Sequence, residues 1–341
     1  MDKKKVWIWL GILIFLAVLL RSVATYGQEI MYDGCGFIMH AWSIAKGHLT
    51  TPYWAPGIDH YHPPLYPFFI YLFHFFTGSW QVAAKAVSAI FGGLLLIPIY
   101  ILARDMFDRE TGIFSSAFLV SYPLLVIVGS NAYSEPLCLF LLAWGALYGW
   151  RMITRQKAQT AFASGLLLGL AYLSRNQAIT GLASLVLILI FFWLIQHKLN
   201  FGQFIKFLAL LLIGFYLFAF PYDFYSYKKN KIWGLRFRQE FFKKGYLFHK
   251  ELEWRIREGT LAQDTDELLN FHLARTVSPI YFVIANPKIY SNWVKKELIY
   301  VMKHIVQKNV IVPPIISVSI LILIINLISQ KEFGYYKDRY I

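Results

Sequence analysis

Long apolar stretches alternate with short polar turns along most of the chain. A helix that crosses the hydrocarbon core of a bilayer needs about 20 mostly apolar residues, with a range of about 17–25. Runs near this length predict an all-α, polytopic membrane protein with about eight transmembrane helices. The runs are 6–20, 86–103, 111–134, 134–150, 158–174, 176–196, 207–222 and 309–330. A shorter apolar stretch, 65–77, follows two prolines and predicts a juxtamembrane or re-entrant helix.

The composition agrees with this pattern. Of the 341 residues, 57% are hydrophobic and only 15% are charged, whereas soluble domains average about 45–50% apolar and about 25% charged residues. A soluble enzyme, a disordered chain and a coiled coil are therefore disfavoured. The formal charge is +14. Because Lys and Arg gather at membrane surfaces, we expect the bilayer and not a nucleic acid to be the partner of this charge.

The positions of the basic residues predict the orientation. Three lysines at 3–5 precede the first run, which places the N-terminus in the cytoplasm under the positive-inside rule. Eight crossings then return the C-terminus to the cytoplasm as well. The first run has only 15 residues, and Ser22-Val23-Ala24 resembles a cleavage site, so a signal peptide remains an alternative to a first span.

This orientation divides the chain into three parts. Residues 1–222 form a transmembrane catalytic core, whose outer loop at 22–81 carries the candidate site. Residues 223–308 form an outer basic and aromatic segment with amphipathic pieces, which suggest helices lying on the membrane surface. Residues 309–341 hold the last span and a cytoplasmic tail.

Acids and histidines beside the apolar runs are the candidates for chemistry. The outer loop contains Asp33 and the stretch His60-Tyr61-His62-Pro63-Pro64. Glu135 lies at the outer mouth of the fourth span, where Ser134 can cap the helix and Pro136 fits its first turn. Acids at the membrane boundary are costly and tend to be functional, although an acid at a helix N-terminus is also favourable in itself.

A cation at the outer end of the fifth span completes this set. Arg175 could bind phosphate oxygens through its planar guanidinium, or it could be an interfacial arginine that extends toward water. The predicted orientation places Asp33, His62, Glu135 and Arg175 on the same outer side. This coincidence depends on the number of spans, since one miscounted helix would separate the four.

The ordered set of motifs resembles the polytopic C-type glycosyltransferases, in particular the family 39 protein mannosyltransferases and the aminoarabinose transferases of lipid A. The resemblance covers about 25–235. The stretches that carry it are Asp33, 41–47, His62-Pro63-Pro64-Leu65, Ala103-Arg104-Asp105-Met106-Phe107, Ser134-Glu135-Pro136-Leu137 and 169–175.

This resemblance implies an inverting sugar transfer from a polyprenyl-phosphate donor to a lipid, glycan or protein acceptor. It implies a site on the non-cytoplasmic face, and we expect the plasma (inner) membrane of a prokaryote. Asp33 would be the general base, and Glu135 a second catalytic carboxylate. The cations expected to bind the donor phosphate are His62, Arg175, Lys228 and Lys229. The residues expected to line the site are Tyr32, His60, Tyr61, Tyr66, Asn131 and Asn176.

Some alternatives stay open at this point. A divalent cation would suit a phosphate leaving group, and Asp33, His62 and Glu135 would then be its ligands. A lipid or glycan transporter (flippase) is a second function, although that class usually holds its polar residues at the bilayer midplane. A non-catalytic subunit that has kept the fold is a third. A disulfide between Cys35 and Cys138 is conceivable on the outer face.

Overall fold

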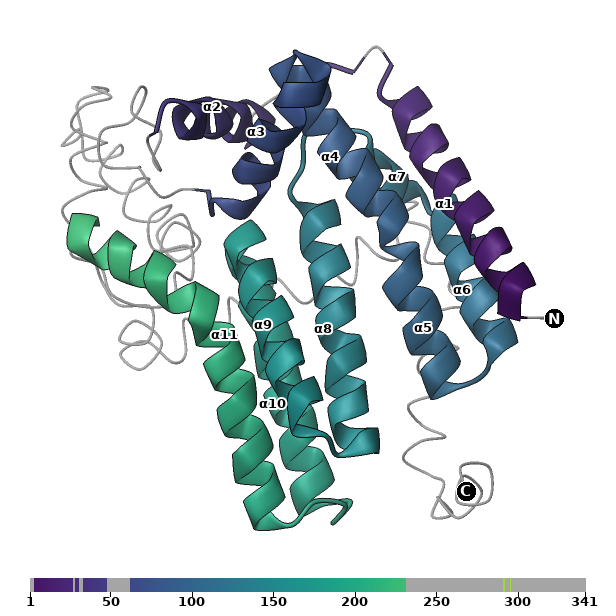
Figure 1. Ribbon diagram of the computed structural model, residues 1–341, viewed down its shortest axis with the longest axis vertical. Coiled ribbons are helices and arrows are strands. Elements are labelled where there is room, and N and C mark those ends of the chain that lie inside the picture. The colour runs from purple at the N-terminus through teal and green to yellow at the C-terminus, as the bar shows by residue number, and fades with distance from the viewer. Residues whose placement is uncertain are drawn as a thin grey trace. The chain divides into compact units, whose positions relative to one another are not determined.

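The computed structural model describes residues 3–26, 28–30, 33–47 and 62–230, together with Ser291 and Lys295. Within these ranges every regular element is a helix (Figure 1), which confirms the expected all-α fold. Contacts divide the chain into units at 1–238 and 239–341, and all the helices named here belong to the first. The expected last span at 309–330 lies outside the described residues.

The elements follow one another along the chain without any long connection between 62 and 230. They are α1 (Lys3–Ala24), α2 (Asp33–Ala45), α3 (Leu65–Thr77), α4 (Trp80–Leu94), α5 (Leu96–Met106), α6 (Arg109–Val120), α7 (Pro123–Gly129), α8 (Glu135–Arg155), α9 (Ala158–Ser174), the short 3-10 helix η1 (Asn176–Ala178), α10 (Ile179–Leu194) and α11 (Phe201–Asn230).

Five helical segments are long and apolar enough to cross a bilayer: α1, α4 with α5, α8, η1 with α10, and α11. The pair α6 and α7 adds a sixth if its 58° bend lies within a single crossing. Helix α9 is apolar but has only 17 residues. All seven spans expected in the described ranges are therefore helical, and the protein is an integral membrane protein.

The run at 111–134 is the one that departs most from its prediction, because it is a broken helix and not a straight one. The break falls at Ser121-Tyr122, directly before Pro123. A residue that precedes proline is pushed out of the helical region by the proline ring, and Tyr122 is extended, with φ −61° and ψ 115°. Proline then starts α7, because its fixed φ suits the first turn of a helix.

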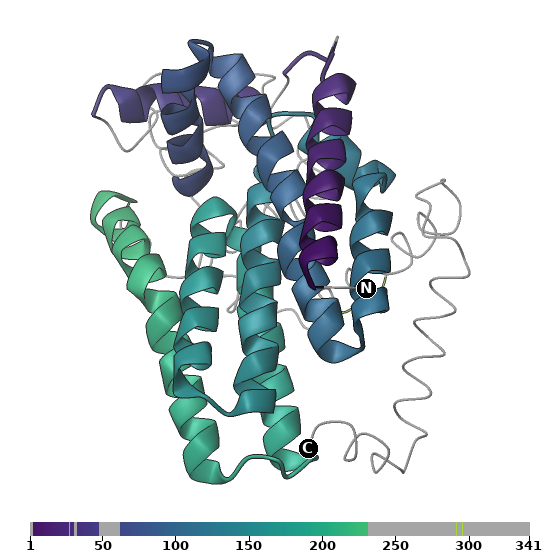
Figure 2. The same ribbon diagram turned by 45° about the vertical axis from the view of Figure 1, so that its right-hand side comes forward.

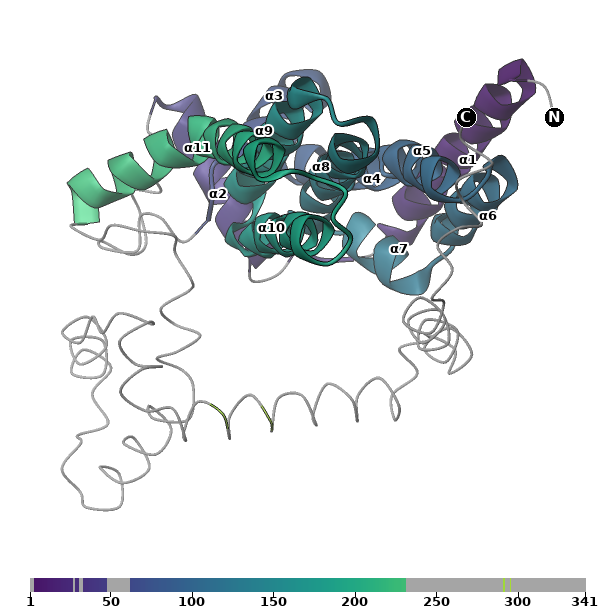
Figure 3. The same ribbon diagram turned by 90° about the horizontal axis from the view of Figure 1, so that it is seen from below.

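Helices α9 and α11 pack with their backbones almost touching, and glycines make this possible. A Cβ added at Gly169 would lie 2.5 Å from the carbonyl oxygen of Phe215, and one added at Gly165 would meet the backbone of Leu211 more closely still. Small residues allow such an approach between helices in membranes. Seen end on (Figure 3), α9, α10 and α11 lie on one side of α8, and α1, α5 and α6 lie on the other.

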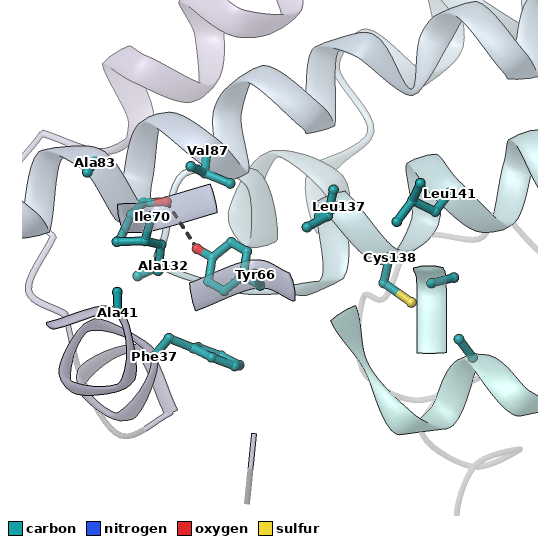
Figure 4. Packing of buried hydrophobic residues seen from close by; sticks show 13 residues of the cluster. Phe37, Ala41, Tyr66, Ile70, Ala83, Val87, Ala132, Leu137, Cys138 and Leu141 are labelled. Carbon is teal, nitrogen blue, oxygen red and sulfur yellow. Dashed lines mark hydrogen bonds between the residues drawn. The ribbon is translucent and has the colours of Figure 1, made fainter. Parts of the chain in front are cut away.

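The short helices α2 and α3 lie at the end of the bundle where α1 finishes and α8 begins (Figures 1 and 2). A buried apolar cluster fixes them there. It joins Phe37 and Ala41 of α2 and Tyr66 and Ile70 of α3 to residues of α4, α8 and α9 (Figure 4). The 13-residue length of α3 is too short to span, as expected for a juxtamembrane helix.

Candidate active site

The clearest polar contact at this end of the bundle joins two of the predicted residues. Glu135 is the first residue of α8, and Arg175 directly follows α9. Nη1 of Arg175 donates to Oε1 of Glu135 across 2.5 Å, and the two side chains are 29% and 30% exposed. Arg175 is thus directed to a carboxylate that lies 40 residues earlier in the chain.

Ser134 reinforces this junction in a way that differs from its predicted role. Its side chain makes no capping bond to α8, and its own backbone is already helical, with φ −78° and ψ −12°. A capping residue normally has an extended backbone, so the predicted cap is wrong. Instead, Ser134 Oγ accepts from Arg175 Nη1 at 3.5 Å, and its carbonyl accepts from Ser174 Oγ at 3.3 Å. Pro136 does lie in the first turn, as predicted.

Two buried acceptor atoms, one in this pair and one in the residue that follows Arg175, lack partners among the described residues. Oε2 of Glu135 and Oδ1 of Asn176 are both buried without a hydrogen bond to any described residue. An acceptor that is left unsatisfied in a buried position costs about 1–3 kcal/mol, and such groups call for an explanation. Hydroxyl groups of a ligand or a water molecule would supply the missing donors.

Asp33 lies close to the turn that precedes Glu135, because the next residue, Gly34, packs against that turn. It is the first residue of α2, where an acid is favoured by the helix dipole. A Cβ added at the next residue, Gly34, would lie 2.6 Å from Ile30 Cγ2 and 3.2 Å from Ala132 Cβ. The start of α2 is therefore packed against the turn that leads into Glu135, and only glycine fits between them.

His62 and Tyr66 pack against α2, and Tyr66 also connects it to α4. The ring of His62 is 4.2 Å from that of Phe37, and His62 is only 9% exposed. Tyr66 is buried, which raises the pKa of its phenol and keeps the O–H protonated. The phenol oxygen lies 2.7 Å from Ser88 Oγ, and that hydroxyl donates to the carbonyl of Tyr133 at 2.8 Å.

Comparison with known proteins finds one related family. Residues 61–222 match the family model described as dolichyl-phosphate-mannose-protein mannosyltransferase. The resemblance to the C-type glycosyltransferases is confirmed. No curated protein matches the chain. The matched range, slightly under half of the chain, includes His62, Glu135 and Arg175, whereas Asp33 lies before it.

In this glycosyltransferase-like bundle, a buried arginine that the sequence interpretation passed over holds α1 to the broken span. Arg21 is fully buried, and it donates to the carbonyls of Val120 at 3.3 Å and Leu119 at 3.4 Å, at the end of α6. A Cβ at Gly92 or Gly129 would come within 3 Å of its side chain. Helix α1 therefore packs as an integral part of the bundle.

Polar contacts continue from Arg21 toward Glu135. One turn further, Thr25 Oγ1 donates to the carbonyl of Ser130, and Asn131 Nδ2 donates to the side-chain oxygen of Gln28. Lys85 of α4 donates to the carbonyl of Gln28 at 2.6 Å. The available signal was the run of polar residues Arg21, Thr25 and Gln28 at and just beyond the end of α1. Of the predicted lining residues, Asn131 belongs to this network.

On α11, the candidate Lys228 and the nearby buried acid Asp223 both have partners of their own. Asp223 is buried and accepts from the hydroxyl of Tyr172 at 2.9 Å. Lys228 lies over the ring of Phe224, 5.0 Å from its centre. Helix α11 extends to Asn230, beyond the boundary expected at 222. The remaining candidates, namely Tyr32, His60, Tyr61 and the side chain of Lys229, lie outside the described residues.

The predicted metal ligands do not come together as a set. Among the described residues there is no group of three or more His, Cys, Asp or Glu side chains that could hold a metal ion, so Asp33, His62 and Glu135 do not form such a group. Cys35 is exposed, Cys138 is buried, and both are free. The conceivable disulfide is therefore absent from this structure.

Proposed function

We propose that this protein is a glycosyltransferase that transfers a sugar from a polyprenyl-phosphate donor to an acceptor at the outer end of the bundle. One observation carries the proposal. A partly exposed arginine, Arg175, pairs with Glu135, whose second oxygen is buried without a partner, and the next residue, Asn176, holds another such oxygen. All three residues lie within the range that matches a mannosyltransferase family. A cation suits the phosphate of such a donor, and the unpartnered acceptors suit the hydroxyls of its sugar.

The reaction needs one bond to form as another breaks. A base removes the proton of the acceptor hydroxyl, and the acceptor oxygen attacks the anomeric carbon from the side opposite the phosphate. The bond between that carbon and the phosphate oxygen breaks, and the electron pair leaves with the polyprenyl phosphate. The anomeric configuration is therefore inverted. The reaction therefore requires one carboxylate base and positive charge near the phosphate.

We assign the base to Asp33. Its helix is packed through Gly34 against the turn before Glu135, so its carboxylate belongs to the same end of the bundle as Arg175. General-base catalysis by a positioned carboxylate typically contributes about 10²–10⁴-fold in rate. Removing the negative charge should lower turnover by a factor of that size and leave donor binding largely intact.

Arg175 is assigned to the donor phosphate, and Glu135 to the orientation of Arg175. In the structure Glu135 uses one oxygen for Arg175, while the other has no partner among the described residues. An arriving phosphate would share the guanidinium, which presents five N–H donors. The second oxygen of Glu135 would then accept a hydroxyl of the sugar. His62, buried against Phe37, is proposed to support the same phosphate.

The proposal is tested by transfer from a panel of radiolabelled polyprenyl-phosphate sugars in proteoliposomes. Asp33→Asn should lower both sugar transfer and the slow hydrolysis of the donor by about 10²–10⁴-fold, with normal membrane insertion. Glu29→Gln is the matched control, because Glu29 is an exposed acid only four residues away. It should turn over like the wild type. Equal loss in both variants would argue against a specific role for Asp33.

Other outcomes separate the alternatives. If no donor is consumed but a labelled lipid crosses the bilayer, the transporter function is favoured. If neither occurs with well-folded protein, the non-catalytic function is favoured. Arg175→Ala should raise the KM for the donor more than that for the acceptor. Unchanged donor kinetics would remove Arg175 from the phosphate site.

A further inference from the structure

The end of the bundle opposite the candidate active site carries a compact group of three arginines. They surround Asp105, which lies in the last turn of α5. Arg104 Nη2 lies 2.7 Å from Asp105 Oδ1, and Arg151 Nη2 lies 2.7 Å from Oδ2. Arg155, one turn beyond Arg151 on α8, is 3.6 Å from Oδ2. We call these four residues the arginine cluster.

The cluster carries more positive charge than it needs to join α5 to α8. Three guanidiniums face one carboxylate, so two positive charges are uncompensated within the group. Arg151 alone would link the helices, since both its Nε and its Nη2 contact Asp105. The side chain of Asp105 is only 12% exposed, whereas those of Arg104 and Arg155 are 38% and 52% exposed. Both of these side chains are therefore accessible to a ligand.

The nearby acids do not cancel this charge. Asp108 accepts from the backbone N–H of Thr111 and so caps α6, while Glu110 is exposed in the first turn of α6. Lys157, just beyond α8, adds a further positive charge. Counted over 104–110 and 151–157, the basic residues exceed the acidic ones by two.

The residues around the cluster are typical of the membrane–water boundary. Its arginines lie at the ends of two membrane spans, α4–α5 and α8. The guanidinium of Arg104 lies 5.7 Å from the ring centre of Tyr100, and that of Arg151 lies 6.0 Å from the ring centre of Tyr148. Tyrosines are enriched at this depth, and basic pockets between membrane helices on the cytoplasmic side bind anionic head groups.

We propose that the arginine cluster binds the head-group phosphate of an anionic phospholipid in the cytoplasmic leaflet. One guanidinium can donate two hydrogen bonds to the oxygens of a phosphate. Asp105 holds three guanidiniums close together before the lipid binds. The apolar faces of α5 and α8 would accompany the acyl chains. This ligand is distinct from the sugar donor, because the cluster lies at the other end of the bundle.

The test measures lipid binding by native mass spectrometry and thermal unfolding of the purified full-length protein. The probe is phosphatidylglycerol, added to protein in a neutral detergent, with phosphatidylcholine as the reference lipid. Phosphatidylglycerol should bind more tightly and raise the unfolding temperature. One basic residue near a membrane surface contributes about 1 kcal/mol, so Arg155→Gln should weaken phosphatidylglycerol binding about five-fold.

Two comparisons make the test specific. Lys157→Gln removes an exposed charge two residues away that does not belong to the cluster, and it should change binding less than two-fold. Arg104→Gln gives a second cluster variant if Arg155→Gln is poorly folded. Equal binding by wild type and both cluster variants would overturn the proposal. An equal loss in Lys157→Gln would also overturn it, in favour of a diffuse surface charge.

The source of the phosphate is tested in a separate arm. Sodium phosphate at the concentration of the lipid should not displace bound phosphatidylglycerol, because a free ion lacks the contacts of the acyl chains. Displacement would overturn the lipid assignment in favour of a soluble phosphate ligand. None of these measurements depends on sugar transfer, so their outcome tests this proposal independently of the proposed function.

Discussion

Arg21 gives the sharpest test of how the bundle positions the end that carries the candidate site. It is fully buried in a membrane-spanning helix, and its described hydrogen-bond partners are backbone carbonyls. Two of these carbonyls, those of Leu119 and Val120, belong to the last turn of α6. They have no helical partner, because Pro123 ends the helix at the bend. The perturbation is Arg21→Met, which keeps a long unbranched side chain and removes every donor.

The expected cost follows from these two carbonyls. A buried acceptor that loses its donor costs about 1–3 kcal/mol, so the pair gives an upper limit of about 6 kcal/mol. Removing a buried cation works in the opposite direction, since burial of a charge is itself costly. We therefore expect Arg21→Met to lower the free energy of unfolding by about 2–4 kcal/mol.

The assay is thermal and denaturant unfolding of the detergent-solubilised protein, followed by tryptophan fluorescence. Arg21→Lys is the control, because it keeps the charge and donors but lacks the reach of a planar guanidinium. It should fall between the wild type and Arg21→Met. A variant Arg21→Met that is as stable as the wild type, or more so, would refute the reasoning. The two carbonyls would then find other donors.

Three further changes test neighbouring contacts, each by the same unfolding measurement. Tyr172→Phe removes a donor from the buried carboxylate of Asp223 and should cost about 1.5–3 kcal/mol; an unchanged stability would mean that this bond contributes nothing. Gly169→Ala forces α9 away from the backbone of α11 and should cost about 1–3 kcal/mol; full stability would show that the helices can separate freely. Thr25→Val removes the bond to the carbonyl of Ser130 and should cost about 0.5–1.5 kcal/mol, whereas Thr25→Ser should keep it, and equal losses in both would point to packing instead.

The membrane architecture was largely predictable from the sequence because hydrophobicity is a local property of a span. Lipid offers no partners to backbone polar groups, so an apolar run of sufficient length must be helical. This reasoning predicted helices in all seven apolar runs of the described ranges, of which five, or six with the bent pair, are long and apolar enough to cross a membrane. It missed the bend at Ser121-Tyr122, although Pro123 was visible, because hydropathy averages over a window and ignores one residue.

The site was predictable only in part. The prediction that Glu135 and Arg175 share one side of the membrane followed from counting spans, but their direct contact joins residues 40 positions apart and required the packing of α8 against α9. Ser134 failed as a cap because its own backbone is already helical, and its hydroxyl accepts from Arg175 across the bundle, which a local rule does not consider.

The sequence by itself determined that the chain enters the membrane many times, and its motifs indicated a glycosyltransferase. The tertiary structure alone decided which polar groups share a location. Arg21 looked like the polar end of a hydrophobic run, and it became a buried donor to α6 only when α1 packed against the broken span. Hydrophobic patterning acts on each segment separately, whereas polar partners are chosen among all the segments that folding brings together.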